Sequence, residues 1–154
     1  MAVIQIDDLI DTNKLYQIII KEIEESQNKF SKILNEKETE IENKYIEIES
    51  SKLILNEKEM NIIINDYNES LNDYNNTINE FNNHYQNEII KIRKILLKEI
   101  IVIAEKYAKD NEIDLILDST SYLIASNKLD ITNIIKNELD KKIINLEFNK
   151  FEKH

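Results

Sequence analysis

The chain has 154 residues, contains no Gly, Pro, Cys or Trp, and carries a formal net charge of −10 at pH 7. The absence of Gly and Cys excludes P-loops, dinucleotide-binding turns, disulfides and thiolate or zinc-finger chemistry, which depend on those two residues. Only His84 and His154 could act as imidazole bases, and only Arg93 is an arginine. We therefore predict a protein that is not an enzyme, with no catalytic residues, no metal site, no cofactor and no nucleic-acid partner.

The sequence also argues against stable insertion into a membrane. Its apolar runs are all shorter than the roughly 20 residues that a spanning helix needs. The chain begins without a basic segment and a long apolar run, so a signal peptide is not part of it. These features fit a cytosolic protein or an exported one whose signal has been removed.

A short strand is predicted at the start of the chain. Residues 2–6 are mostly apolar, and Asp7 and Asp8 follow them, either of which could cap the next helix. We assign residues 1–11 to a small β base that also includes residues 112–154.

Residues 12–111 are predicted to form a helical hairpin, a coiled-coil arm. In its second half, apolar residues recur about every 3.6 residues from Tyr67 to Tyr107, which is the repeat of a straight α-helix. The first half has a poorer stripe, interrupted at Ser26, Lys37, Lys52 and Glu59. Each stripe would otherwise be exposed to water, so we expect the two halves to pair antiparallel. Equal arm lengths place the reversal near residues 61–66, where Asn61, Asn65 and Asp66 favour a turn.

The base resumes after the arm. Asn111 is expected to end the long helix in a left-handed conformation, and strands are expected at residues 113–117 and 122–125 with a turn at Ser119 and Thr120. Asp130 or Thr132 would cap a final helix. Residues 145–154 are expected to continue that helix or to fray. The fold class is therefore α+β, mostly α, with a helical hairpin on a base of three strands whose edges pair with other subunits.

Charge is concentrated in the arm. Residues 35–90 hold 4 Lys and 13 acidic residues, a net −9. This surface either attracts basic segments of a partner and repels anionic membrane, or is a solvated face that maintains solubility. Glu80, His84 and Glu88 share a helix face but lack further metal ligands. A basic cluster, which is either a weak anion site or a set of partners for nearby acids, consists of Lys91, Arg93, Lys94 and Lys98.

The residues of the predicted base carry a family resemblance. The stretch from Ile113 to Asp118, the stretch from Ser119 to Ser126 and the Asp130-Ile131-Thr132 triplet resemble the carboxy-terminal signature of the Skp/OmpH family of periplasmic chaperones. The stretch Ala2–Asp7 is similar to that family's first strand. The resemblance extends over about residues 2–142. Members often carry Gly where this chain has Glu112.

The resemblance implies a homotrimer in the periplasm whose strands close an intersubunit β-barrel. Three helical arms would then surround a cavity that holds unfolded outer-membrane β-barrel proteins and prevents their aggregation without ATP, although the client-facing residues are not identified. The residues predicted for the trimer base are Val3, Ile4, Ile113, Leu115, Leu117, Leu123 and Ile124. The alternative is a structural or scaffold coiled coil, a stalk or adaptor that binds one defined partner; a pure stalk has no need of the strands.

Overall fold

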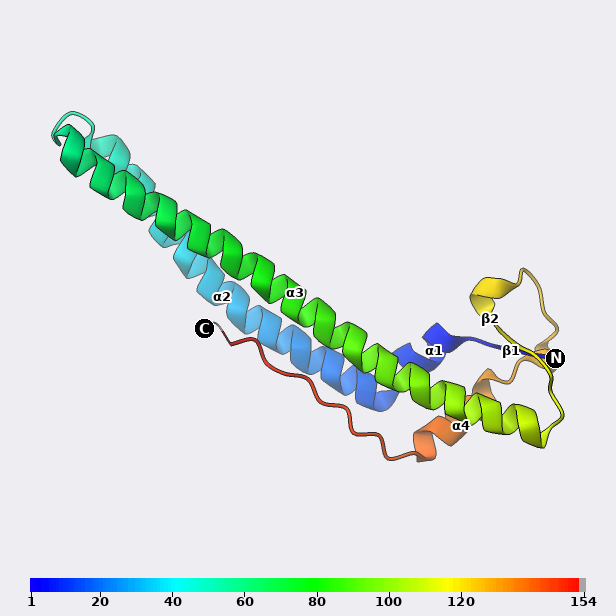
Figure 1. Ribbon diagram of the computed structural model, residues 1–154. Helices are drawn as coiled ribbons and strands as arrows, with labels where there is room; N and C mark the ends of the chain where they lie inside the picture. The colour runs from blue at the N-terminus through cyan, green and yellow to red at the C-terminus, as the bar shows by residue number, and fades with distance from the viewer. Residues whose placement is uncertain (153–154) are drawn as a thin grey trace. The chain divides into compact units, whose positions relative to one another are not determined.

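The computed structural model describes residues 1–152 of the chain (Figure 1). Its elements are β1 (Ala2–Ile4), α1 (Ile6–Asp11), α2 (Lys14–Ser51), α3 (Glu57–Asp110), β2 (Ile116–Asp118), the 3₁₀ helices η1 (Ser119–Ser121) and η2 (Asn127–Leu129), and α4 (Thr132–Lys141). These elements form two compact units. Unit 1 contains Met1–Glu22 and Asn87–Asn149, and unit 2 contains Ile23–Gln86 together with the residues from Lys150 onward.

Unit 2 is a pair of antiparallel helices made by the second part of α2 and the first part of α3 (Figure 1). Phe30 on α2 contacts Phe81 on α3, and Lys37 further along α2 contacts Asp73, which is earlier in α3. This order of contacts is that of an antiparallel pair. The apolar stripe predicted from Tyr67 to Tyr107 lies on one uninterrupted helix, and each of its positions is buried or half-buried. The mostly helical fold with a small strand base is confirmed.

The predicted position of the reversal is wrong. The chain turns at residues 52–56, and residues 61–66 lie inside α3. Asn56 and Glu59 form a reciprocal capping box: the Glu59 N–H donates to Asn56 Oδ1 at 3.0 Å, and the Asn56 N–H donates to Glu59 Oε2 at 3.2 Å. The assumption of equal arms also fails, because α2 has 38 residues and α3 has 54. The last turns of α3 belong to unit 1.

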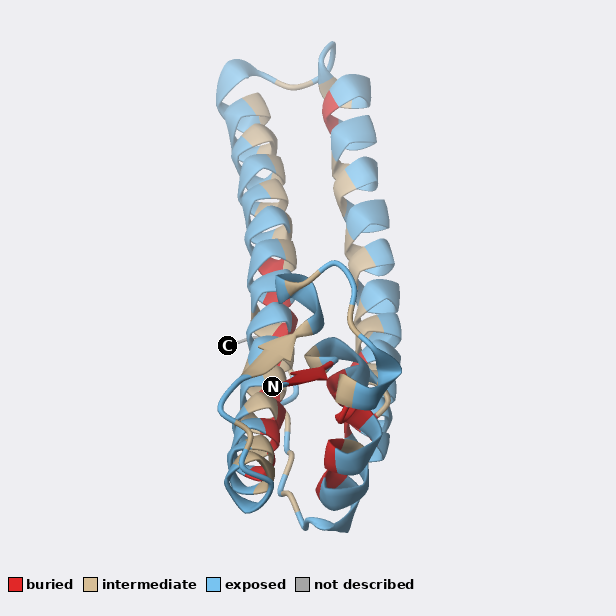
Figure 2. Cartoon of the chain, turned by 90° about the vertical axis from the view of Figure 1, so that its right-hand side faces the viewer, coloured by how far each residue is buried: buried red, intermediate tan, exposed pale blue. Residues whose placement is uncertain are grey.

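Unit 1 is organised around β1, which is buried along its whole length (Figure 2). It pairs in parallel with β2, so that Ala2 lies opposite Ile116 and Val3 opposite Leu117. On its other side, Val3 accepts a hydrogen bond from the Ile131 N–H at 3.0 Å. β1 is therefore the central segment of the base.

Of the three strands predicted for the base, the described chain forms two. Residues 122–125 form no strand: the Tyr122 backbone is extended, but Leu123 lies in a bend. The second strand is shorter than the predicted 113–117 and shifted to Ile116–Asp118. A strand requires a partner for its backbone groups, and within one chain β1 already has neighbours on both sides. The predicted division into base and arm domains, 1–11 with 112–154 against 12–111, stays a prediction.

Two predicted helix ends are also corrected. Asp7 and Asp8 lie in the first turn of α1 and do not cap it, because the helix begins at Ile6. The left-handed residue after α3 is Glu112, with φ of 53°, and not Asn111. The Asp130 carboxylate does support the start of α4 by accepting the Thr132 N–H at 2.8 Å.

Candidate functional site

The residues predicted for the trimer base fall into two groups in unit 1. Val3 and Ile4 are buried, and Ile113 and Leu117 are half-buried. The other three are exposed, with exposed fractions of 48% for Leu115, 100% for Leu123 and 92% for Ile124. A single chain therefore buries the central strand of the base but leaves apolar side chains of the same region in water.

An apolar hollow of about 410 Å³ lies in the same unit. Side chains from β1, from the end of α3 and from the segment before β2 line it, including Ile4, Ile100, Ala108, Ile113 and Leu115. A hollow of this size would accept one or two apolar side chains. The sequence predicted Ile4, Ile113 and Leu115 for the base, but it did not indicate the hollow, because residues of α3 complete it.

Two aspartates hold the base together. Asp118 accepts hydrogen bonds from the Ile6 N–H at 3.1 Å and from the Thr120 hydroxyl at 2.6 Å. Partial burial acts to raise the pKa of Asp118, but the hydrogen bonds from Thr120 and Ile6 outweigh it, so the pKa lies below its usual value. Hydrogen bonds from the Thr132 side chain and N–H lower the pKa of Asp130 against a smaller effect of burial. Both carboxylates thus favour the folded base in their charged form.

Acidic side chains partner part of the predicted basic cluster. Arg93 binds Asp7 and Asp11, at 2.8 Å from the latter, and its guanidinium also donates to the Tyr16 hydroxyl at 3.3 Å. The hydrogen bond to Tyr16 is the main reason that the pKa of Arg93 is raised. Lys91 pairs with Glu88.

Lys94 and Lys98 line a shallow hollow together with Lys91, beside Ile90 and Ile95. Three of the four basic residues therefore surround one hollow, whereas Arg93 binds Asp7 and Asp11.

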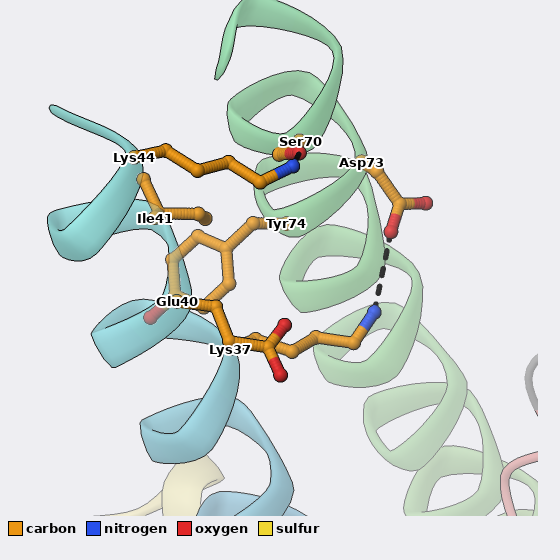
Figure 3. Close-up of a pocket in the computed structure, with 7 residues that line it drawn as sticks. All are labelled: Lys37, Glu40, Ile41, Lys44, Ser70, Asp73 and Tyr74. Atoms are coloured by element: carbon orange, nitrogen blue, oxygen red, sulfur yellow. Dashed lines mark hydrogen bonds and ion pairs between the residues drawn. The ribbon is translucent and has the colours of Figure 1, made fainter. Parts of the chain in front are cut away.

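The arm in unit 2 carries polar contacts between its helices. Lys37 pairs with Asp73 at 3.2 Å, and Lys44 donates to the Ser70 hydroxyl at 2.7 Å (Figure 3). Lys44 also pairs with Asp66 at 2.7 Å. A cavity of about 100 Å³ lies among them, which is room for a few water molecules and not for a ligand. Two of the interruptions in the sequence stripe, Ser26 and Lys37, are thus interhelical partners, with Ser26 bonded to Tyr85 at 2.5 Å.

The C-terminal segment was predicted as continued helix or frayed end, and that prediction is wrong for its described part. Helix α4 ends at Lys141, and residues 143–152 are not helical. In unit 2, Phe151 lies edge-on to Phe30 and Phe81, with ring centroids 5.2 and 5.4 Å away. Residue 154, the second histidine, lies outside the described residues.

Neither metal binding nor membrane crossing finds a structural basis in residues 1–152. No group of three His, Cys, Asp or Glu side chains there could hold a metal ion. No helix among these residues is long and apolar enough to cross a membrane. Glu88, the last residue of the Glu80-His84-Glu88 series, instead bonds Lys91 and the Asn149 backbone.

Paired helices joined to a small parallel strand base define the class of α+β proteins with a helical arm. The model of one protein family, "Outer membrane protein (OmpH-like)", matches residues 1–139. The chain belongs to this OmpH-like family, which is a family of chaperones and not of enzymes.

The fold is also found among solved structures. One of them is a crystal structure of a candidate outer membrane chaperone (OmpH-like) from Caulobacter crescentus CB15, superposed with a TM-score of 0.73 at 12% sequence identity. The match covers 98% of this chain and 89% of the other. No curated protein matches the chain. Family membership supports a chaperone role in general terms.

Proposed function

We propose that the chain is an ATP-independent holdase that binds unfolded outer-membrane β-barrel proteins in the periplasm and prevents their aggregation. The observation that carries the proposal is the family match over residues 1–139. The lack of Gly agrees with action without ATP, since a nucleotide-cradling loop needs it.

The active form in this proposal is a homotrimer closed through the base. Two features of unit 1 support the trimer: an apolar hollow of about 410 Å³, and the exposed apolar side chains of Leu123 and Ile124, which could fill such a hollow on another subunit. Burying apolar side chains in such a hollow stabilises association by about 25 cal/mol per Å² of apolar surface. Residues 122–125 pair with no strand in the single chain, so their backbone groups are available to a strand of another subunit.

The arms provide the surface that holds the client. Apolar side chains are exposed along unit 2, among them Ile33, Tyr45 and Ile46, and at the turn Leu53 and Ile54. Many separate apolar contacts suit weak, reversible binding of an unfolded chain. The net charge of −9 in residues 35–90 keeps such a surface soluble.

Two measurements on the same preparation test the proposal. Light scattering should give the mass of a trimer at micromolar concentration, and the protein should keep a denatured β-barrel protein soluble on dilution without ATP. A stable monomer would refute the trimer. A trimer that leaves the client to aggregate would favour the scaffold alternative.

The Leu123→Asp variant tests the base directly. Because Leu123 is fully exposed in the single chain, Asp there should leave the helical content unchanged but disperse the trimer into monomers. Leu53→Asp is the matched control, since Leu53 is 99% exposed at the arm's turn, and it should remain trimeric. A trimeric mass for both variants would show that residue 123 does not lie in the interface between subunits.

A further inference from the structure

The chain's own Phe151 lies in an aromatic site of unit 2, which we call the aromatic socket: Phe30, Phe81, His84 and Tyr85. Phe30 and Phe81 stack with centroids 4.2 Å apart, and Tyr85 meets Phe81 edge-on at 5.0 Å. Phe151 approaches three of these rings by its edge, with His84 5.6 Å away. Such edge-to-face arrangements are the favoured geometry of aromatic pairs. The socket therefore provides edge-to-face contacts for one further aromatic ring.

A backbone contact accompanies the ring. The Phe151 N–H donates to the Tyr85 hydroxyl oxygen at 3.4 Å, and that hydroxyl is itself fixed by Ser26 at 2.5 Å. Within unit 1, the Asn149 N–H donates to Glu88 Oε2 at 2.9 Å. Side chains of α3 thus accept hydrogen bonds from backbone N–H groups of this segment, and every residue except Pro has such a group. This recognition depends on an extended backbone and on one aromatic side chain, and otherwise not on sequence.

The segment that supplies Phe151 has the pattern of a half-buried strand. Ile144, Leu146 and Phe148 are half-buried, while Asn145 and Glu147 between them are exposed. Alternation with period two and aromatic residues near the ends are the features of strands in membrane β-barrels. The segment therefore has the chemistry of the client proposed above.

Several features allow the segment to leave. Phe151 is only half-buried, its N–H bond is long, and residues 143–152 belong to no helix or strand. The walls of the socket do not depend on Phe151, because Phe30, Phe81 and Tyr85 also contact one another or Ser26.

We propose that the aromatic socket is a binding site for an aromatic residue on an extended segment of unfolded client, and that Phe151 occupies it until a client displaces it. The inference rests on the proposed client binding and adds a specific site and a competing occupant. The tethered Phe151 acts as an intramolecular competitor, whose effective concentration over a short flexible connection is in the millimolar range.

The test uses the full chain with Phe151→Ala and a fluorescent peptide of residues 145–154. This variant should bind the peptide about tenfold or more tightly than the wild type, because its own competitor is gone. Ile143→Ala is the matched control: it shortens a fully exposed aliphatic side chain of the same segment and should bind as weakly as the wild type. Unfolded β-barrel protein should displace the peptide.

A second peptide with Ala in place of its Phe151 keeps the test independent of any effect of the variant on folding. It should not bind the Phe151→Ala protein. Equal binding of both peptides, or equal affinity in wild type and variant, would overturn the socket. If the peptide binds but unfolded β-barrel protein cannot displace it, the socket binds only the chain's own segment, and its role as a client site is refuted. Aggregation suppression by the wild type, measured alongside, tests the holdase proposal separately, since it can succeed while the peptide fails to bind.

Discussion

At the scale of single residues, Glu112 takes a left-handed backbone conformation that Gly usually adopts, because the chain contains no Gly. Helix α3 ends in a hydrogen bond from the Ile113 N–H to the Ala108 carbonyl at 2.9 Å, the closing bond of a Schellman motif. That motif puts the intervening residue in the left-handed region, and here it is Glu112 at φ of 53°. A side chain with a Cβ is disfavoured there by about 1 to 2 kcal/mol.

We expect Glu112→Gly to stabilise the protein. The relief of left-handed strain, less the added backbone freedom of Gly in the unfolded chain, should give a net gain of about 0.5 to 1 kcal/mol. Urea denaturation at matched protein concentration measures it. Asn111→Gly is the control, because Asn111 is not left-handed and its side chain bonds the Tyr107 carbonyl at 2.9 Å; this variant should lose stability. A gain for Asn111→Gly and none for Glu112→Gly would contradict this account.

Asp118 gives the base a dependence on pH. Its pKa is lower in the folded chain than the unperturbed value of 3.8, so the unfolded state binds more protons in acid. The stabilisation is complete above the unfolded pKa and is lost as the pH falls through the lowered folded pKa. The pKa of Asp130 is shifted in the same direction, and its contribution is lost in the same way.

The Asp118→Asn variant should be less stable than the wild type by about 1 to 2 kcal/mol at pH 7, the worth of charge-assisted hydrogen bonds. The difference should shrink once the pH falls below about 4, because the wild-type carboxyl then becomes protonated too. Thermal melts from pH 7 to pH 2.5 measure this. Asp114→Asn removes the same charge from an exposed neighbour and should change stability little. A difference for Asp118→Asn that stays constant with pH would rule out the carboxylate as its source.

At the scale of the elements, the capping box at the start of α3 decides where the arm reverses. Asn56 and Glu59 exchange two hydrogen bonds with backbone N–H groups that a helix start leaves unpaired. Asn61 and Asp66 have the same turn preference, but they lie within a continuous helix, and Asp66 pairs with Lys44. A reciprocal pair of caps outweighs isolated turn-forming residues.

Asn56→Ala and Asn61→Ala should therefore have opposite effects. The first removes the cap and should cost about 1 kcal/mol. The second replaces an exposed residue in the interior of a helix by the best helix former and should gain a few tenths of a kcal/mol. Paired urea titrations decide the matter: the reverse order of stabilities would put the turn back at residues 61–66.

The helices could be predicted from the sequence because their signal is local. The apolar repeat from Tyr67 to Tyr107 extends over forty residues without Gly or Pro, and α3 follows it. The capping box at Asn56 was also readable, as an Asn followed three residues later by Glu, but the assumption of equal arms concealed it. The contacts of Ser26 and Lys37 were not readable, because polar residues in a stripe indicate a partner only once the facing helix is known.

The base and its surroundings were harder to predict because their contacts are not local. Residues 122–125 have the composition of a strand, yet they form none, and the central strand β1 already has neighbours on both sides. The hollow beside Ile4 exists because the end of α3 comes to lie there, which no spacing in the sequence indicates. The position of Phe151 in the aromatic socket likewise depends on residues 66 or more positions away in the sequence, whereas the sequence predicted continued helix or a frayed end for residues 145–154.

At the scale of the whole molecule, the uneven charge is the feature with the clearest consequence. Residues 35–90 carry a net −9 of the total −10. A holdase must release its client, so its contacts should be weak, and long-range attraction can then speed capture without slowing release. Attraction between exposed charges is screened over about 8 Å at physiological salt.

The rate at which the protein captures a basic unfolded client should therefore fall as salt rises, while capture of an acidic client of similar length should stay constant or become faster. Stopped-flow fluorescence at salt concentrations from about 20 to about 500 mM measures both capture rates, because the screening of the attraction increases over this range.

The same charge predicts weak adherence to anionic liposomes at low salt, since each approach brings like charges together. Lys94 and Lys98 are the local exception, because they line an open hollow in unit 1. Substantial co-sedimentation with anionic liposomes that Lys94→Glu with Lys98→Glu abolishes would show that this pair outweighs the net charge, and the electrostatic account of capture would then have to be abandoned.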